Sequence, residues 1–272
     1  MKYIFFGSPE FAAIILEKLI SADYIPAVAV CNPDRPMGRK KVITAPSTKI
    51  VAEKHGIRVW QPDSLGIGNW KLEINKLGGI DFAVVAAYAK IIPKVILDTL
   101  PAKFVGVHPS LLPKHRGASP IQTAILKGDE LTGLTLYLID EKVDHGPVLA
   151  KRELNYELRI MNYEKTQRKL ANLGGDLLVE TLPKFVNGEI KPQPQNEAEA
   201  TYTKKFTTED AFVDLEKDNP VEIERKIRAL NPEPGAWTML NGKRTKLLEA
   251  EIVDKKLRLK KIQAEGKTPV FL

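Results

Sequence analysis

Short apolar segments alternate with helix-like patterns through the first half of this 272-residue chain. The clearest segment, residues 82–87, consists of apolar residues only. Such runs are typical of parallel strands covered by helices on both faces. Residues 3–6, 27–31 and 105–107 are further candidate strands, and apolar residues recur at helical spacing over 11–19. Strands separated by helices form βαβ units. The pattern predicts an α/β fold with a Rossmann-like, doubly wound, mostly parallel sheet.

The last third of the chain has a different pattern. A long helix predicted over 170–186 is followed by a polar, proline-bearing stretch, which is typical of a linker. A short helix then begins at Asn219-Pro220, and short alternating segments follow, with Asn241-Gly242 as a strong hairpin signal. We therefore expect a first domain over 1–187, a linker over 188–201, and a small β-barrel-like domain over 202–272.

Composition places the chain among soluble globular proteins, with 43% hydrophobic and 28% charged residues. No apolar run approaches the ~20 residues that span a bilayer, and the apolar start is too short for a signal peptide. Cys31 is the only cysteine, so no internal disulfide can form, and we expect a cytoplasmic protein. The formal charge of +7 is compatible with a polyanionic partner.

His108 and Asp144 each follow a predicted strand, and strand ends of an open α/β sheet are where ligands bind. A carboxylate beside an imidazole stabilises its cationic form, and such a pair can stabilise an oxyanion or move a proton. A structural histidine and an aspartate in a turn explain the same spacing, so both interpretations stay open. His55, His115 and His145 have no metal-ligand spacing, and we expect no metal.

Two basic regions are candidates for phosphate binding. The loop over 33–41 contains Arg35, Arg39, Lys40 and Lys41, and the C-terminal region contains a second set that includes Lys243 and Arg244. Such residues either form a solvated surface or bind phosphates through charge-assisted hydrogen bonds. The turn after residue 6 lacks the second and third glycines of a dinucleotide-binding loop and no P-loop lysine follows, which argues against NAD and ATP.

Motifs over nearly the whole chain share a pattern with a known family. They are 6–12 (FGSPEFA), 33–39 (PDRPMGR), 61–62 (QP), 87–88 (AY), 108–117 (HPSLLPKHRG), 120–122 (PIQ), 140–146 (DEKVDHG), 202–205 (YTKK) and 228–237 (RALNPEPGAW). Together they resemble the methionyl-tRNA formyltransferases, a family of folate-dependent formyltransferases. The resemblance implies a formyltransferase catalytic domain over 1–187 and a tRNA-binding domain of the OB type over 202–272.

The resemblance also implies a reaction and its residues. The formyl group of 10-formyltetrahydrofolate moves to the α-amine of methionine on initiator tRNA, for translation initiation. His108, held cationic by Asp144, stabilises the oxyanion, and Asp144 helps to accept the amine proton through water. The implied folate-binding residues are Ser110, Leu111, Leu112, Pro113, Tyr88, Ala89 and Lys90. The implied tRNA-binding residues are Arg35, Arg39, Lys40, Lys41, Lys204, Lys205, Lys243 and Arg244. We expect a monomer that has no membrane partner.

The chain departs from this family at Gly106, where the family has an asparagine that donates to the formyl oxygen. Loss of one oxyanion donor commonly costs about a hundred- to a thousandfold in rate. A glycine here predicts a space that water can fill. Three interpretations stay open: a weakened enzyme, an enzyme with a substitute donor, and a homologue that binds tRNA or folate without catalysis. A sugar-nucleotide or small-amine N-formyltransferase is disfavoured by the basic regions. Relatives continue beyond Leu272, so we also expect a shortened C-terminal domain.

Overall fold

The computed structural model describes residues 1–38, 40–100, 103–155 and 160–272. The chain divides into two compact units, each built from more than one stretch of sequence. The first unit comprises Met1–Arg116, Gly133–Glu153 and Arg168–Ala200, and the second comprises Gly117–Thr132, Leu154–Gln167 and Thr201–Leu272.

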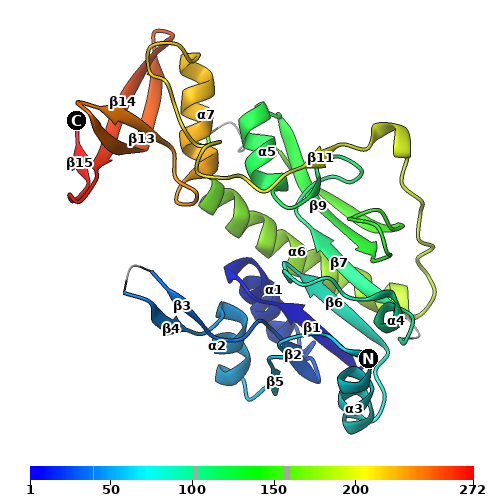
Figure 1. Cartoon of the computed structure of the whole chain (residues 1–272). Coiled ribbons are helices and arrows are strands. Elements are labelled where there is room, and N and C mark those ends of the chain that lie inside the picture. Colours follow the sequence, from blue (N-terminus) through cyan, green and yellow to red (C-terminus); the bar gives the residue numbers. More distant parts are fainter. Residues whose placement is uncertain (39, 101–102, 156–159) are drawn as a thin grey trace. The chain divides into compact units, whose positions relative to one another are not determined.

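A seven-stranded sheet forms the centre of the first unit, with the strand order β10-β9-β7-β6-β1-β2-β5 (Figure 1). Each neighbouring pair from β7 to β5 is parallel, whereas β9 runs antiparallel to β7. The strands are β1 Tyr3–Gly7, β2 Val28–Val30, β5 Val59–Trp60, β6 Phe82–Ala86, β7 Phe104–His108, β9 Leu131–Leu138 and β10 Val148–Asn155.

Helices and an aromatic cluster enclose this sheet. Phe6, Trp70 and Phe104 lie in one buried cluster, and the Trp70 indole N–H donates to Thr99 Oγ1 at 2.8 Å. Gly174 lets one helix lie close to the sheet, because a Cβ there would meet side chains of Leu134 and Val107 at 2.8 and 3.3 Å. The helices with a part in this unit are α1 Glu10–Ser21, α2 Ser47–Lys54, α3 Ile67–Leu77, α4 Lys94–Leu97 and α6 Tyr163–Val186.

The second unit contains an antiparallel sheet in the order β12-β13-β14-β15. Asn241 and Gly242 form the β12–β13 turn, where both have the positive φ, 50° and 71°, that this tight turn requires. Ile223 and Ile227 of α7 pack with Leu247 of the sheet in a separate core. The elements are α5 Pro120–Lys127, α7 Pro220–Leu230, β12 Trp237–Leu240, β13 Lys243–Val253, β14 Lys256–Ala264 and β15 Val270–Phe271.

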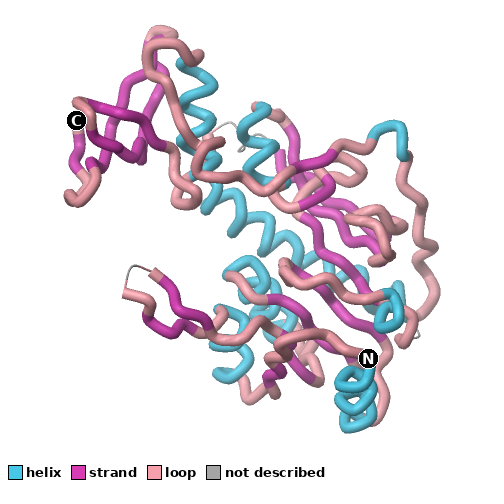
Figure 2. Tube along the Cα trace, viewed as in Figure 1, coloured by secondary structure: helices cyan, strands magenta, loops and turns pink. Residues whose placement is uncertain are grey.

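The predicted fold class is confirmed: a mostly parallel sheet with helices, and a C-terminal antiparallel sheet consistent with a small barrel. Two features differ from the sequence-based prediction. The basic loop contains a hairpin of β3 Arg35–Met37 and β4 Val42–Thr44 (Figure 2), and β9 gives the sheet an antiparallel side. The short elements β8 Arg116–Gly117, η2 Glu197–Glu199 and β11 Tyr202–Thr203 complete the chain. None of the helices over the described ranges combines the length and apolar character that crossing a bilayer requires.

Candidate active site

His108 ends β7 at the carboxyl edge of the parallel strands, where its side chain is buried with 5% of its surface exposed. Its Nε2 lies 2.9 Å from the backbone carbonyl oxygen of His115. A carbonyl oxygen only accepts, so Nε2 carries a proton and donates. The other ring nitrogen, Nδ1, lies 3.5 Å from Oδ2 of Asp144. A ring that can donate through Nε2 while its other nitrogen faces a carboxylate has the geometry expected for oxyanion stabilisation.

Asp144 lies in a loop whose backbone is held by a side chain from the predicted linker. Its φ of 47° is left-handed, a conformation that costs free energy outside glycine and asparagine. The Gln195 amide donates to the carbonyl oxygens of Asp144 and Gly146 at 2.9 and 2.8 Å. Buried Arg116 in turn donates to Gln195 Oε1 at 2.8 Å and to both carboxylate oxygens of Glu197. Sequence reasoning assigned Gln195 only to a linker, and its contacts make it part of the Asp144 loop.

Gln195→Ala is expected to lower the free energy of unfolding by about 1–3 kcal/mol, because two loop carbonyls and Arg116 lose a partner. Urea denaturation measures this change. Gln193→Ala is the matched control, because that exposed amide donates only within its own segment, to Lys191. Equal stability of the two variants would contradict the assigned role of Gln195.

Tyr137 fills the space beside Gly106. These two residues are direct partners in the β7–β9 register, and a Cβ on Gly106 would lie 2.4 Å from Tyr137 Cε1 and 2.6 Å from Cζ. The predicted water-filled space is therefore wrong, because an aromatic ring occupies it. The ring also stands edge-on to His108, with centroids 6.5 Å apart and an interplanar angle of 90°.

The Tyr137 hydroxyl donates to Oδ1 of Asp144 at 2.6 Å. Burial, and then the charge of Asp144, hold the pKa of this phenol well above its ordinary value, so that it stays a neutral donor. Sequence reasoning missed Tyr137. A glycine that faces an aromatic residue on a neighbouring strand would have indicated it. This pairing can be recognised only when the register between β7 and β9 is known.

The segment that follows His108 is fixed from β9. The Thr135 hydroxyl donates to the carbonyl oxygen of Ser110 at 2.7 Å and accepts from the Leu112 N–H at 3.0 Å. Leu112 and Pro113 are buried and joined by a cis peptide bond, whereas Leu111 is half-buried. The Ser110 hydroxyl donates to the Lys114 carbonyl at 2.6 Å. These contacts give the candidate folate-binding segment a single backbone path.

The second candidate folate segment, Tyr88 to Lys90, follows β6 through the left-handed Ala87. Tyr88 packs edge-on against Phe6, and burial raises its pKa to about 12. Within the described part of the chain, no group forms a hydrogen bond with its buried hydroxyl. Ala89 is exposed, and the Lys90 ammonium donates to the carbonyl oxygens of Pro62 and Asp63.

Sequence comparison assigns the chain to a family. Residues 1–184 match the formyl transferase family model, and residues 205–269 match the formyl transferase C-terminal domain. The methionyl-tRNA formyltransferase of Kosmotoga olearia is 40% identical over 254 residues, which are 93% of this chain and 81% of that relative. The chain belongs to the methionyl-tRNA formyltransferase family. The predicted resemblance is thereby confirmed. As a member of this family, the chain is a formyl-transferring enzyme.

Solved structures share the fold of this family member. The methionyl-tRNA formyltransferase from Clostridium thermocellum aligns with a TM-score of 0.62 and 18% identity, over 97% of this chain and 98% of that one. HypX from Aquifex aeolicus in complex with tetrahydrofolic acid aligns with a TM-score of 0.68 and 19% identity. That match covers 100% of this chain and 46% of HypX, so the chain spans less than half of the HypX chain. At these identities the likeness shows the fold alone.

The basic loop of this family member is an exposed hairpin whose base is anchored. Arg35, Lys40 and Lys41 are exposed, and Arg39 lies outside the described residues. At the base, the Asp34 carboxylate accepts hydrogen bonds from Lys49 and Gln61, both at 2.8 Å. The Lys49 contact, more than any other, holds the pKa of Asp34 below its usual range. The hairpin therefore projects three described cations from a fixed base.

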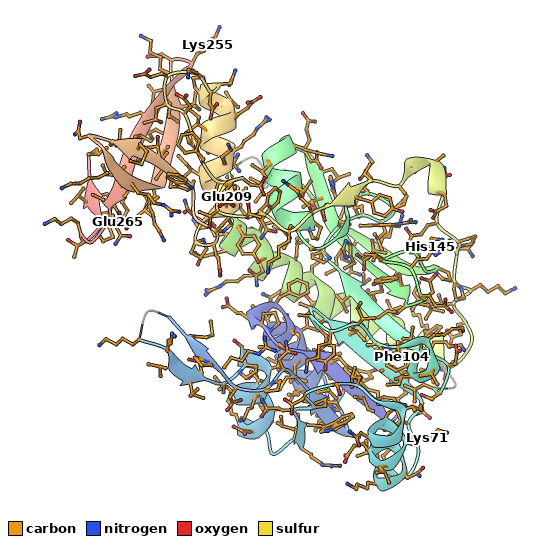
Figure 3. The ribbon with its side chains drawn as sticks, viewed as in Figure 1. Lys71, Phe104, His145, Glu209, Lys255 and Glu265 are labelled. Atoms are coloured by element: carbon orange, nitrogen blue, oxygen red, sulfur yellow. The ribbon has the colours of Figure 1, made fainter. Side chains whose placement is uncertain are left out.

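The basic residues predicted near the C-terminus have separate surroundings. The Lys204 ammonium lies 2.5 Å from Asp210 Oδ1, whereas Lys205 is exposed. Lys243 begins β13, and the Arg244 guanidinium lies over the Trp237 ring, 4.3 Å from its centroid. Further lysines are exposed along this sheet, including Lys255 at the tip of the β13–β14 turn (Figure 3).

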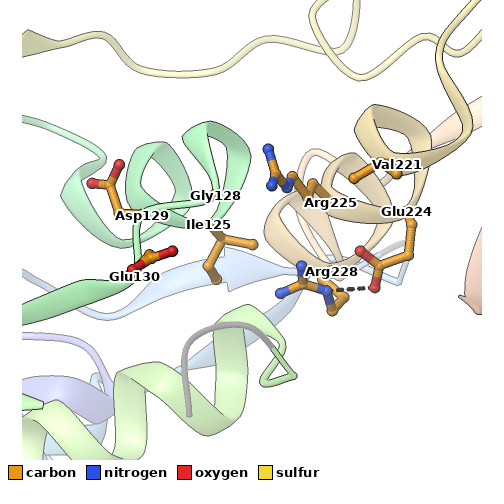
Figure 4. Close-up of a pocket in the computed structure, with 8 residues that line it drawn as sticks. All are labelled: Ile125, Gly128, Asp129, Glu130, Val221, Glu224, Arg225 and Arg228. Atoms are coloured by element: carbon orange, nitrogen blue, oxygen red, sulfur yellow. Dashed lines mark hydrogen bonds and ion pairs between the residues drawn. The ribbon is translucent and has the colours of Figure 1, made fainter. Parts of the chain in front are cut away.

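A pocket of about 280 Å³ lies between α5 and α7 of the second unit and contains none of the predicted site residues (Figure 4). Arg228 and Glu224 form a close ion pair in it, with 2.5 Å between Nε and Oε1. Its lining residues are Ile125, Gly128, Asp129, Glu130, Val221, Glu224, Arg225 and Arg228. Among the described residues that line it, there is no histidine, cysteine, serine or threonine. In the described ranges, His, Cys, Asp and Glu form no cluster of three or more that could hold a metal ion.

Proposed function

We propose that this chain transfers the formyl group of 10-formyltetrahydrofolate to the α-amine of methionine on initiator tRNA, for translation initiation. The observation that carries the proposal is the buried His108–Asp144 pair at the carboxyl edge of the sheet, in a chain of this family. Relatives at about 40% identity are named methionyl-tRNA formyltransferases, and a solved structure of the same fold binds tetrahydrofolic acid.

In the proposed reaction the methionine amine attacks the formyl carbon, and negative charge develops on the formyl oxygen. His108 stabilises this oxygen by a hydrogen bond from Nε2–H. In the absence of substrate, the same N–H donates to the His115 carbonyl oxygen. An oxyanion is the stronger acceptor, so it displaces that carbonyl. The proton of the amine passes through water to Asp144. The bond between the formyl carbon and N10 of the folate then breaks, and N10 takes the proton that Asp144 received. The products are formylmethionyl-tRNA and tetrahydrofolate, and Asp144 is ionised again.

The folate is proposed to bind along Ser110, Leu111, Leu112 and Pro113, opposite Tyr88, Ala89 and Lys90. The fixed backbone of the first segment supports this proposal, because a pre-formed site loses less entropy on binding. The buried Tyr88 hydroxyl supports it as well, because an unsatisfied buried donor costs free energy that a polar ligand group can recover.

The exposed hairpin is proposed to bind tRNA through Arg35, Arg39, Lys40 and Lys41, with Lys204, Lys205, Lys243 and Arg244 as further contacts. Arg35→Ala and Lys41→Ala should each weaken tRNA binding and reduce the slope of log affinity against log salt by about 1. Filter binding over a salt series measures both quantities. Lys71→Ala is the control, because Lys71 is an exposed lysine on α3 (Figure 3). An unchanged slope in both hairpin variants would contradict this assignment.

We further propose that the chain works in the cytoplasm as a monomer, with a catalytic domain over 1–187, a linker over 188–201 and a tRNA-binding domain over 202–272. The buried free thiol of Cys31 supports a reducing compartment, and the separate cores of the two units support a division of tasks. Sedimentation equilibrium with and without initiator tRNA tests the monomer, and two protein copies per tRNA would contradict it.

One assay tests the proposed function. The purified chain is incubated with 10-formyltetrahydrofolate and methionyl initiator tRNA, and acid–urea gels resolve formylated from unformylated tRNA. Product that depends on both substrates supports the proposal. A nucleotide-linked amino sugar serves as the alternative acceptor, and faster transfer to the sugar would overturn the tRNA assignment. Binding of methionyl-tRNA without product at any pH would indicate a binding protein instead.

A further inference from the structure

We infer that Tyr137 is a positioning residue for the transfer reaction: its hydroxyl fixes the Asp144 carboxylate in the orientation that presents Oδ2 to His108. The inference rests on the proposed function for its kinetic test, and it also predicts a property of the resting protein. Tyr137 is additional to the His108–Asp144 pair and acts through Asp144.

Three groups are among the contacts of Asp144. Oδ1 accepts from the Tyr137 hydroxyl at 2.6 Å, Oδ2 lies 3.5 Å from His108 Nδ1, and the backbone carbonyl accepts from Gln195 at 2.9 Å. The Tyr137 contact with the carboxylate is shorter than the His108 contact. A short O–H···O bond to a charged oxygen is among the stronger hydrogen bonds in proteins, so Tyr137 strongly restrains the orientation of the carboxylate.

Tyr137 itself has little freedom to move. It is 6% exposed, its ring packs over Gly106 on the facing strand, and its edge-on contact with His108 fixes one side. An aromatic side chain has only two rotatable bonds, so little entropy is lost in holding it. The strand β9 therefore delivers a rigid donor to Asp144, which itself lies in a loop with a left-handed backbone.

The Tyr137 hydroxyl is one of several polar groups around Asp144. Other charged or titratable groups surround Asp144 and its loop: His108 of β7, Asp140 and His145 of the same loop, Arg116 through Gln195, and Glu197 beyond Arg116. None of these contacts is removed when the Tyr137 hydroxyl is deleted.

Tyr137→Phe removes the hydroxyl and keeps the ring. We expect kcat to fall about ten- to a hundredfold with KM for both substrates nearly unchanged, because the lost hydrogen bond is to a charged group. We also expect the Nδ1 resonance of His108 to change, because the carboxylate that faces this nitrogen loses its restraint. Tyr3→Phe is the matched control: Tyr3 is a buried tyrosine of β1 whose hydroxyl donates to the Tyr24 carbonyl at 2.8 Å, and its loss should leave both quantities unchanged.

Three results decide the inference. A fall in kcat with KM nearly unchanged supports positioning, whereas an unchanged kcat overturns it. Nitrogen-15 NMR of the His108 ring gives an answer without substrates, because a displaced Asp144 carboxylate changes the Nδ1 resonance in Tyr137→Phe and not in Tyr3→Phe. An unchanged Nδ1 resonance overturns the inference. If the unaltered chain transfers no formyl group, the proposed function fails, and the NMR comparison still decides the role of Tyr137.

Discussion

His108→Ala is expected to lower kcat for formyl transfer by about a thousandfold. The imidazole lies at the carboxyl edge of the sheet, with one ring nitrogen on the His115 carbonyl and the other facing Asp144. Alanine removes both the oxyanion donor and the ring that faces Asp144, and loss of one such donor alone typically costs about a hundred- to a thousandfold. Single-turnover assays with saturating folate and methionyl-tRNA measure the change at the chemical step.

The loss should be confined to chemistry. Binding of methionyl-tRNA should stay within about twofold, because the proposed tRNA contacts are on other segments of the chain. His55→Ala provides the control, since His55 follows α2 and contacts Glu17 at the surface. A His108→Ala variant that retains more than a third of the original kcat would remove the oxyanion role from His108.

Sequence alone predicts the parts of this molecule that depend on local patterns. The apolar run at 82–87 became β6, a buried strand between two parallel neighbours, because residues apolar on both faces are stable only inside such a sheet. The placement of His108 at a strand end was also predictable, because a buried strand before it and a proline-bracketed loop after it are both visible in the sequence. The structure adds the 3.5 Å contact with Asp144.

Features that depend on register between distant segments could not be predicted. The Gly106–Tyr137 contact arises because β9 pairs antiparallel with β7, and a shift of one residue would turn Tyr137 to the other face. The contacts of Gln195 could not be predicted from the sequence either. Its polar, proline-rich surroundings indicate a linker. Its role in holding the Asp144 loop depends instead on two backbone carbonyls that lie 51 and 49 residues earlier in the chain.

The basic hairpin shows a third limit. Its prolines, glycine and cations indicate an irregular loop, yet β3 and β4 pair there with Arg35 opposite Thr44. The hairpin exposes Met37, Val42 and Ile43, each at 60% or more, so packing against a core does not explain its strands. The anchored base at Asp34 explains where the hairpin begins, because Lys49 and Gln61 hold the chain at that point. Such side-chain anchoring leaves no periodic signal in the sequence.

Gly106→Asn is expected to damage the site, although an asparagine here would match the motif that the family resemblance implies. A Cβ at this position would lie 2.4 Å from the Tyr137 ring, so the ring must move. Overpacking of a buried strand pair typically costs about 1–3 kcal/mol in the free energy of unfolding. Displacement of Tyr137 also breaks its hydrogen bond to Asp144, so kcat should fall about tenfold or more. Urea denaturation and single-turnover kinetics measure the two effects.

Gly68→Asn is the control for the change of residue type. Among the described residues, no atom beyond its chain neighbours and its own helix backbone lies within 4 Å of a Cβ placed there. The double variant Gly106→Asn with Tyr137→Ala separates space from chemistry. If the ring alone opposes the asparagine, the two substitutions are coupled, and the double variant is more stable than the sum of the single changes by about 1–3 kcal/mol. Additive stabilities, or a Gly106→Asn variant that is more active and no less stable than the original chain, would show that the space beside Gly106 is open. Coupled stabilities would mean that glycine at 106 and tyrosine at 137 form one unit, in which neither residue can be exchanged alone.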